Sequence, residues 1–362
     1  MKVSVIIPTY NRCNFLLLTL ESLSIALKEA NYVEIIIVNN NSTDNTDKVI
    51  HKFINNFGAI EVKYVFEQVP GLLAGRHRGF KESSGDVLAF LDDDVLVNKG
   101  WLDGIIDAFK DNSVHLAGGP SLPFYEKSPP QWLDYFWTRE FNFHSCSWLS
   151  LIWQGDHVKE CDSGLVWGLN FCIRKKTMEI LGGFNPDCIP GHLQHYQGDG
   201  ESGLAEKLRK KGLKSIYHPK IMVHHVIPKE RLTHDYFKKR FYYEGIVNSY
   251  ADIRKNKGVL SKSQKHHEEK ETKSFTKNYW QKFRHPRSSI RWFLKQKGYI
   301  KNQNLNSTLT EEEQLKSQYY QAYLYGYNYH QEMVNNSPEL LRWVLKEDYF
   351  DYKLPDLKGY SN

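Results

Sequence analysis

The sequence lacks the features that mark membrane-spanning and disulfide-rich secreted proteins. No apolar run approaches the roughly 20 residues that a transmembrane helix needs, and the apolar stretch at 3–7 is too short for a signal peptide. The 5 cysteines follow neither zinc-site spacing nor a dense disulfide pattern. We therefore expect a cytoplasmic protein in a reducing compartment, with peripheral association at the inner membrane face as an alternative.

The sequence also has little excess of charge of either sign. The chain has 48 Lys and Arg against 42 Asp and Glu, which gives a net charge of +6 over 362 residues. A nucleic-acid-binding protein would carry a denser basic stripe among exposed aromatic side chains, so we expect no nucleic acid partner. The hydrophobic fraction of 41% is enough for one large domain or two smaller ones.

A glycine-rich loop is missing after the first predicted strand, where the chain reads Pro8-Thr9-Tyr10-Asn11. This absence argues against a dinucleotide-binding oxidoreductase and against a sugar nucleotidylyltransferase. Glycines recur later, at Gly71, Gly75 and Gly79. Their spacing places them on one helix face, where they would permit close packing.

Short β-branched runs alternate with longer amphipathic stretches through the first hundred residues, which predicts an α/β fold with a mainly parallel sheet. The predicted strands are 3–7, 33–38, 60–66 and 87–91, and the predicted helices are 15–30, 46–57 and 72–81. Ligands of such sheets bind beyond the carboxyl ends of the strands. The segments at 8–12, 39–44 and 92–94 are therefore the first candidates for a site.

The pattern changes at 120–153, an aromatic and proline-rich stretch that is too apolar for a disordered linker. Further predicted elements are helices at 201–211 and 231–255 and strands at 214–217 and 221–226. The polar stretch at 261–274 is typical of a linker or exposed loop. The chain after residue 256 is predicted to be helical and rich in aromatic residues.

Three adjacent carboxylates, Asp92, Asp93 and Asp94, directly follow the strand predicted at 87–91. Like charges so close together repel, and a divalent cation among them would relieve the repulsion. Mg²⁺ or Mn²⁺ held by one or two carboxylates keeps its other positions for water and phosphate oxygens. The alternative is a solvated acidic turn.

These carboxylates, the polar loop at 38–46, the turn at 6–12 and the glycine segment at 71–79 together resemble the family 2 glycosyltransferases of the GT-A fold. The resemblance runs from Val3 to about Thr233. It implies that Asp94 is the main metal ligand, assisted by Asp92, and that Asp93 lies near the ribose. The residues that it implies for nucleotide-sugar binding are Pro8, Thr9, Tyr10, Arg12, Asn39, Asn40, Arg76, Asp92 and Asp93.

The base-reading loop departs from the family pattern. Family members commonly carry an aspartate where this chain has Asn39 or Asn40. An asparagine accepts through its carbonyl oxygen but also donates, so the charge-assisted bond to a base N–H is lost. The identity of the base therefore stays open.

The acceptor-side segment of the family matches 181–185 and 197–204. A carboxylate there takes the proton from the attacking hydroxyl in inverting transfer. Counting back from Leu204 places this role on Glu201, with Asp199 as the alternative, because the chain reads Asp-Gly-Glu where the family usually reads Glu-Asp. Either residue could instead be a helix cap.

Two further groups come from the resemblance. His224 and His225 end a predicted strand, and only one of them can reach the metal, since neighbouring strand residues point to opposite faces. Spacing slightly favours His225. Trp167, Gly168 and Asn170 lie where the family lines its acceptor pocket, although burial in a core would also explain Trp167.

The resemblance predicts a GT-A domain over residues 1–256, with a nucleotide-sugar half at about 1–118 and an acceptor half at about 119–256, followed by a helical region at 257–362. It implies metal-dependent, inverting transfer of a sugar from a nucleotide diphosphate sugar to a hydroxyl of a glycan, a lipid-linked saccharide or a small molecule, with Mn²⁺ or Mg²⁺ as cofactor. Such a reaction serves glycan or surface polysaccharide synthesis. The alternative is a catalytically silent nucleotide-sugar binding or scaffold protein.

Overall fold

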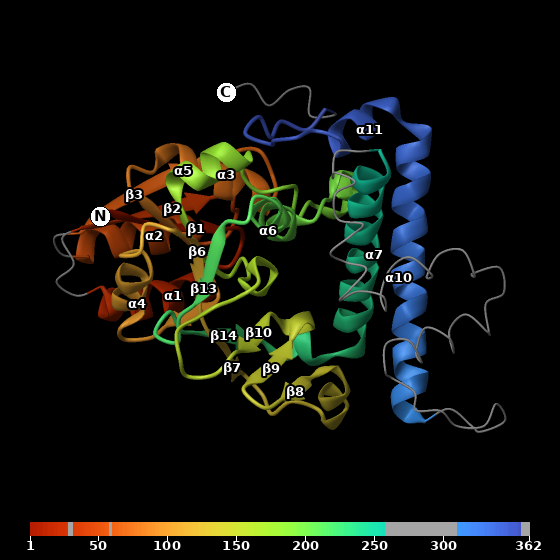
Figure 1. Ribbon diagram of the computed structural model, residues 1–362, viewed down its shortest axis with the longest axis horizontal. Helices are drawn as coiled ribbons and strands as arrows, with labels where there is room; N and C mark the ends of the chain where they lie inside the picture. Colours follow the sequence, from red (N-terminus) through yellow and green to blue (C-terminus); the bar gives the residue numbers. More distant parts are fainter. Residues whose placement is uncertain (28–31, 58–59, 258–309, 356–362) are drawn as a thin grey trace. The chain divides into compact units, whose positions relative to one another are not determined.

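The computed structural model describes residues 1–27, 32–57, 60–257 and 310–355 (Figure 1). The chain divides into two compact units, one formed by Met1–Leu232 together with Lys346–Asn362 and the other by Thr233–Leu345. Each unit has its own packed interior, and the two are described in turn.

The first unit is built on an eight-stranded sheet. Its strands run in the order β11 (Lys159–Glu160), β13 (Lys214–Tyr217), β6 (Val114–Gly118), β12 (Asn170–Arg174), β4 (Val87–Leu91), β1 (Val3–Thr9), β2 (Val33–Asn39) and β3 (Glu61–Phe66). Strands β4, β1, β2 and β3 are parallel, whereas β12 runs antiparallel to both β4 and β6. Every residue of β1 and β2 is buried, as expected for near-continuous apolar strands covered on both faces.

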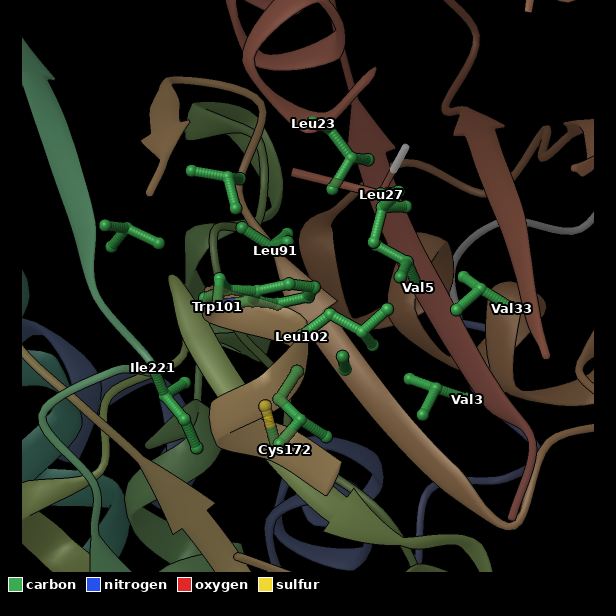
Figure 2. Packing of buried hydrophobic residues seen from close by; sticks show 14 of the residues in the cluster. Val3, Val5, Leu23, Leu27, Val33, Leu91, Trp101, Leu102, Cys172 and Ile221 are labelled. Carbon is green, nitrogen blue, oxygen red and sulfur yellow. The ribbon is translucent and has the colours of Figure 1, made fainter. Parts of the chain in front are cut away.

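Six helices lie in the described residues of this unit. They are α1 (Cys13–Ala26), α2 (Thr46–Asn56), α3 (Leu72–Glu82), α4 (Trp101–Ala108), α5 (Lys175–Leu181) and α6 (Gly200–Lys210). Figure 2 shows the core on one face of the sheet, where Leu23 and Leu27 of the α1 region, Val5 of β1 and Trp101 of α4 pack together. Trp101 is fully buried and its indole N–H donates to Asn170 Oδ1 at 3.0 Å, so the largest core side chain keeps a polar partner.

Helix α3 approaches β1 through its glycines. A Cβ atom at Gly75 would lie 2.8 Å from Pro8 Cβ, and one at Gly79 would lie 2.3 Å from Ile6 Cγ2. Both distances are shorter than a carbon contact allows, so the predicted close packing on this helix face is confirmed. The glycines bring the side chains of α3 close to the carboxyl end of β1.

The aromatic stretch at 120–153 folds into most of a second sheet. This six-stranded sheet runs β5 (Val95–Val97), β14 (Val223–Ile227), β7 (Ser121–Tyr125), β10 (Leu151–Trp153), β9 (Phe143–Cys146) and β8 (Thr138–Glu140). Short 3₁₀ turns complete the unit at η1 (Gln131–Phe136), η2 (Ser147–Leu149), η3 (Ser163–Leu165), η4 (Gly191–Tyr196) and η5 (Lys229–Leu232). Because β5 begins directly after Asp94 and pairs with β14, this sheet carries His225 to the carboxylates.

Residues 346–355, the C-terminal strap, return to the first unit. The strap packs on α3, where Phe350 stacks on Phe80 with ring centroids 5.2 Å apart. The Tyr352 hydroxyl donates to the buried Glu67 carboxylate at 2.7 Å. The strap is therefore part of the first unit rather than a tail.

The described part of the second unit contains α7 (His234–Asn256), α10 (Glu311–Asn336) and α11 (Pro338–Val344). Helices α7 and α10 lie side by side (Figure 1). They cross at two glycines: a Cβ atom at Gly245 would lie 2.1 Å from Tyr323 O, and one at Gly326 would lie 2.0 Å from Tyr242 O. Helix α10 begins with a capping box between Thr310 and Glu313.

The predicted α/β fold with a helical C-terminal region is confirmed, although antiparallel β12 makes the main sheet less parallel than expected. Helix α7, which we expected to close the first domain, packs with α10 because their glycines face each other. The predicted boundary at residue 256 stays a prediction. The linker predicted at 261–274 lies outside the described residues.

None of the described helices is both long and apolar enough to cross a membrane.

Candidate active site

The carboxylates predicted from the sequence lie in the turn between β4 and β5, at the carboxyl end of the parallel strands. Asp93 is buried and accepts hydrogen bonds from Thr9 Oγ1 at 2.7 Å and from Arg12 Nη1 at 2.7 Å. Burial raises the pKa of Asp93, Arg12 opposes this rise and the charge of Asp94 adds to it. Two of the predicted nucleotide-binding residues, Thr9 and Arg12, thus contact the acidic turn directly.

Asp94 is buried among cationic and imidazole groups. Its Oδ2 accepts from Arg12 Nη2 at 2.5 Å and from Arg231 Nη2 at 2.9 Å, and it lies 3.3 Å from His225 Nε2. Burial opposes ionisation of Asp94, but His225, Arg12 and Arg231 outweigh it and hold the pKa well below its usual range. Its other oxygen, Oδ1, is buried and has no hydrogen-bond partner within the described part of the chain.

The ring of His225 is oriented by a backbone contact. Its Nδ1 lies 2.8 Å from the carbonyl oxygen of Leu149, which fixes Nδ1 as the donor because a carbonyl can only accept. In the neutral ring, Nε2 is then the acceptor, and it receives a hydrogen bond from Arg231 Nη1 at 2.7 Å. His224 lies on the other face of β14, where its Nδ1 is 2.9 Å from Asn98 Oδ1.

Asp94 and His225 fit a divalent cation. Asp94 supplies a buried carboxylate in which Oδ1 has no hydrogen bond among the described residues, and His225 places its Nε2 3.3 Å from the other oxygen, Oδ2. Among the described residues, no group of three or more His, Cys, Asp or Glu side chains is arranged around a common point. Mg²⁺ and similar ions commonly keep several waters and use only one or two protein ligands besides phosphate oxygens, so a two-residue site is sufficient.

A second cluster forms around Arg76, whose side chain is buried. Its Nη2 lies 3.5 Å from Asp92 Oδ1, and its Nη1 lies 3.5 Å from Glu201 Oε2 and 3.9 Å from Asp187 Oδ2. The guanidinium also stands over the Phe184 ring at 4.9 Å. Burial raises the pKa of Asp187, and the Glu201 charge adds to the effect. Arg76 therefore joins the acidic turn to the start of α6.

Glycine at position 168 makes this cluster possible. Its backbone N–H donates to Glu201 Oε1 at 3.2 Å. A Cβ atom at Gly168 would lie 2.4 Å from Arg76 Nη2 and 3.0 Å from the Glu201 carboxyl carbon. Any side chain there would displace one of the two charged groups, so Gly168 belongs to the cluster through its backbone and its lack of a side chain.

Asp199 and Glu201 have different surroundings. Asp199 is the residue before the first turn of α6, and its Oδ1 accepts from Asn185 Nδ2 at 2.7 Å. Its carboxylate also lies against Gly203, where an added Cβ atom would be 2.5 Å from Oδ1. Glu201 instead faces Arg76 and Gly168, with 26% of its side chain exposed.

The loop asparagines are held by protein contacts. Asn40 donates from Nδ2 to Val69 O at 2.6 Å and to Glu67 O at 3.2 Å, and its Oδ1 accepts from Gly71 N at 3.0 Å. Asn39 likewise accepts from the Ser42 N–H at 2.9 Å through its Oδ1. These contacts use both ends of the Asn40 amide to fix the loop that leads into α3.

Of the other residues predicted to contact a ligand, one is exposed and the rest contact other parts of the protein. Tyr10 has 56% of its surface exposed, so its ring is accessible for stacking, whereas Pro8 packs against α3 at Gly75. Asn170 is buried and uses its amide on Trp101 and on Ile221 O. Trp167 donates to Gly164 O at 3.1 Å and packs partly against the core.

Sequence reasoning did not identify Asp187 or Arg231. Asp187 follows the segment at 181–185 by two residues, and a carboxylate after Pro186 was its only signal. Arg231 lies in η5, six residues after His225, and resembles an ordinary basic residue of a polar turn. Both are recognisable only once the chain brings them to Glu201 and Asp94.

Comparison with known proteins shows which family the N-terminal part of the chain matches. Residues 4–154 match the model of glycosyl transferase family 2. A glucosyl-dolichyl phosphate glucuronosyltransferase of Haloferax volcanii is 22% identical over 258 residues, which is 70% of this chain and 78% of that protein. A dolichol-phosphate mannosyltransferase of Pyrococcus furiosus is 34% identical over 135 residues, which is 35% of this chain and only 38% of that protein.

The fold has a counterpart among solved structures. The mannosyltransferase PcManGT from Pyrobaculum calidifontis, solved in complex with GDP-Man and Mn²⁺, superimposes with a TM-score of 0.51 at 16% identity. The match covers 70% of this chain and 64% of that one. The predicted GT-A architecture is therefore confirmed at the level of the fold.

Proposed function

We propose that this glycosyltransferase, whose residues 4–154 match the model of glycosyl transferase family 2, moves a sugar from a nucleoside diphosphate donor to an acceptor hydroxyl with Glu201 as the general base. The observation that carries this proposal is the position of Arg76, which lies 3.5 Å from both the donor-side Asp92 and the acceptor-side Glu201. The buried Arg76 guanidinium thus fixes the donor side and the acceptor side of the site relative to each other.

The donor is bound at the carboxyl end of β1 and β4. The exposed Tyr10 ring offers a stacking surface for the base, and Asp93 accepts from the ribose hydroxyls once Arg12 turns toward the diphosphate. Asp94 and His225 would hold a divalent cation, which supplies positive charge to offset the charge on the leaving diphosphate. The mannosyltransferase of Pyrobaculum calidifontis was solved in complex with GDP-Man and Mn²⁺, which supports the use of a divalent cation.

Glu201 accepts the proton of the attacking hydroxyl. It lies in the first turn of α6, and the Gly168 N–H and Arg76 hold the carboxylate in one orientation. The partial exposure of its side chain leaves room for an acceptor. The contact of Asp199 with Asn185 supports a positioning role for that residue.

The acceptor is a hydroxyl of a glycan or a lipid-linked saccharide. The names of the Haloferax and Pyrococcus relatives, which refer to dolichyl and dolichol phosphate, support the lipid-linked class. Inversion at the anomeric carbon is consistent with a single base on the acceptor side, because a direct displacement needs one carboxylate to deprotonate the nucleophile.

The proposal is tested with donor hydrolysis and thermal shift. A panel of nucleotide sugars is screened with Mn²⁺ for the donor that raises the melting temperature most, since at equal concentration a ligand that binds more tightly stabilises the fold more. Asp94→Asn should remove both the Mn²⁺-dependent shift and turnover. Full activity of wild type in excess chelator would contradict the metal assignment, and a chain that binds a donor but never cleaves it would be a binding module.

A further inference from the structure

Arg231 bridges the two predicted metal ligands. Its Nη1 donates to His225 Nε2 at 2.7 Å and its Nη2 lies 2.9 Å from Asp94 Oδ2. The two accepting atoms are 3.3 Å apart. The planar guanidinium therefore uses two donors on adjacent nitrogens at once, the bidentate arrangement that arginine favours and lysine cannot form.

The spacing of the two acceptors is that of ligands on one cation. Adjacent ligands of an octahedral Mg²⁺, each at about 2.1 Å, lie about 3 Å apart. The 3.3 Å between His225 Nε2 and Asp94 Oδ2 is close to this value. Leu149 fixes the tautomer that turns the Nε2 lone pair toward Arg231, and the same lone pair is the one a metal would use.

We propose that Arg231 is an internal stand-in for the metal: its guanidinium pairs with Asp94 beside Arg12 and caps His225, and it must leave both when a divalent cation binds. This inference rests on the proposed function, because it takes Asp94 and His225 as the metal ligands. It adds a competition between a side chain and the cofactor, which the metal assignment alone does not contain.

The displaced arginine has room to move toward the surface of the site. Arg231 lies in the 3₁₀ turn η5, and its side chain is 21% exposed, so it has a route to the surface of the site. Removing its contact with Asp94 leaves a guanidinium beside the cation, where the donor diphosphate would bind. A bidentate contact to a phosphate oxygen pair replaces the one to the His and Asp acceptors. Metal and diphosphate should therefore bind cooperatively, since the diphosphate accepts the arginine that the metal releases.

The test measures metal and nucleotide binding rather than turnover. Isothermal titration calorimetry on the full-length chain follows Mn²⁺ alone, and then UDP and GDP at saturating Mn²⁺. Arg231→Gln should bind Mn²⁺ alone about tenfold tighter than wild type, because the competing cation is gone. The same variant should bind the diphosphates about tenfold more weakly in Mn²⁺, because it has lost a charge-assisted contact. A gain in Mn²⁺ affinity together with a loss of diphosphate affinity would identify the exchange of Arg231 between the metal ligands and the diphosphate.

Two further variants separate the bidentate contact from general charge. Lys229→Gln removes one positive charge from the same turn at an exposed position and should leave both affinities within about twofold of wild type. Arg231→Lys keeps the charge but cannot bridge two acceptors, so it should also bind Mn²⁺ more tightly than wild type.

Three results would overturn the inference. If Arg231→Gln binds Mn²⁺ no more tightly than wild type while diphosphate binding stays metal-dependent, Arg231 does not compete with the metal and the proposed function stands. If Arg231→Lys binds Mn²⁺ with the same affinity as wild type, a single positive charge is sufficient for the competition and the bidentate contact has no role. If no protein binds Mn²⁺ even with a diphosphate present, both the exchange and the metal assignment fail.

Discussion

The imidazole of His77 is bonded to the backbone of Tyr349 across 272 positions of the chain. Its Nδ1 donates to the Tyr349 carbonyl oxygen at 2.8 Å, and its Nε2 accepts from the Phe184 N–H at 3.0 Å. Both ring nitrogens are thereby used in one tautomer, and the ring is fully buried. His77 follows Arg76 in α3, so one of the contacts that hold the C-terminal strap comes from the residue next to the site's central arginine.

This bonding makes stability depend on pH. Burial lowers the pKa of His77 to about 3, from an ordinary value near 6.5. Below pH 6.5 the unfolded chain therefore takes up a proton that the folded chain does not, and stability falls as pH falls toward 3. Between pH 7 and pH 5 the loss due to His77 should be about 2 kcal/mol. Urea unfolding of wild type and His77→Gln at both pH values measures it, and an equal loss in the two proteins would contradict it.

The hydroxyl of Tyr352 should stabilise the strap. It donates to Glu67, a buried carboxylate that also accepts from Val69 N at 2.7 Å. Tyr352→Phe leaves one carboxylate oxygen without that donor and should cost about 1–3 kcal/mol of unfolding free energy. Tyr325→Phe is the matched control, because Tyr325 has 69% of its surface exposed and should change stability by less than about 0.5 kcal/mol. Similar losses in both variants would show that the Glu67 contact is not special.

The role of Asn40 can be decided by one substitution. The sequence predicts that it reads the base, whereas its amide is bonded to Val69 O and Gly71 N. Asn40→Asp replaces a donor to a carbonyl with a carboxylate oxygen that repels it. If the residue only holds the loop, the variant should lose about 1–3 kcal/mol of stability and weaken UDP and GDP to the same degree. A selective change for one of the two nucleotides, measured by calorimetry with Mn²⁺, would show that Asn40 reads the base.

Local patterns predicted the parts of the molecule that depend on neighbouring residues. The acidic turn follows a buried strand, so its place at the carboxyl end of the parallel strands could be inferred from β4 alone. The alternation of strand residues predicted that His224 and His225 point apart, and their partners Asn98 and Asp94 differ accordingly. The glycines of α3 signalled close packing through their spacing.

Contacts between distant segments could not be predicted in the same way. Arg76 and Glu201 are 125 positions apart, and nothing in either local sequence indicates that they share a hydrogen bond. The second sheet depends on β14 returning between β5 and β7, a pairing set by tertiary structure rather than by propensity. Asn170 matched a family position in sequence, yet its amide serves Trp101 in the core. Residue type and spacing therefore predicted the place of the acidic turn in the fold but not the partners of each side chain.

The most direct measurement compares Glu201→Gln with Asp199→Asn for transfer rate and for donor affinity in the same Mn²⁺ buffer. A general base acts only in the transition state, so its loss lowers turnover without changing donor affinity. We expect Glu201→Gln to reduce transfer about 100-fold to 10,000-fold with nearly unchanged donor binding, and Asp199→Asn to cost less, because Asp199 contacts Asn185 rather than the Arg76 cluster. A dead Asp199→Asn enzyme beside a near-normal Glu201→Gln enzyme would contradict the assignment of Glu201 as the base.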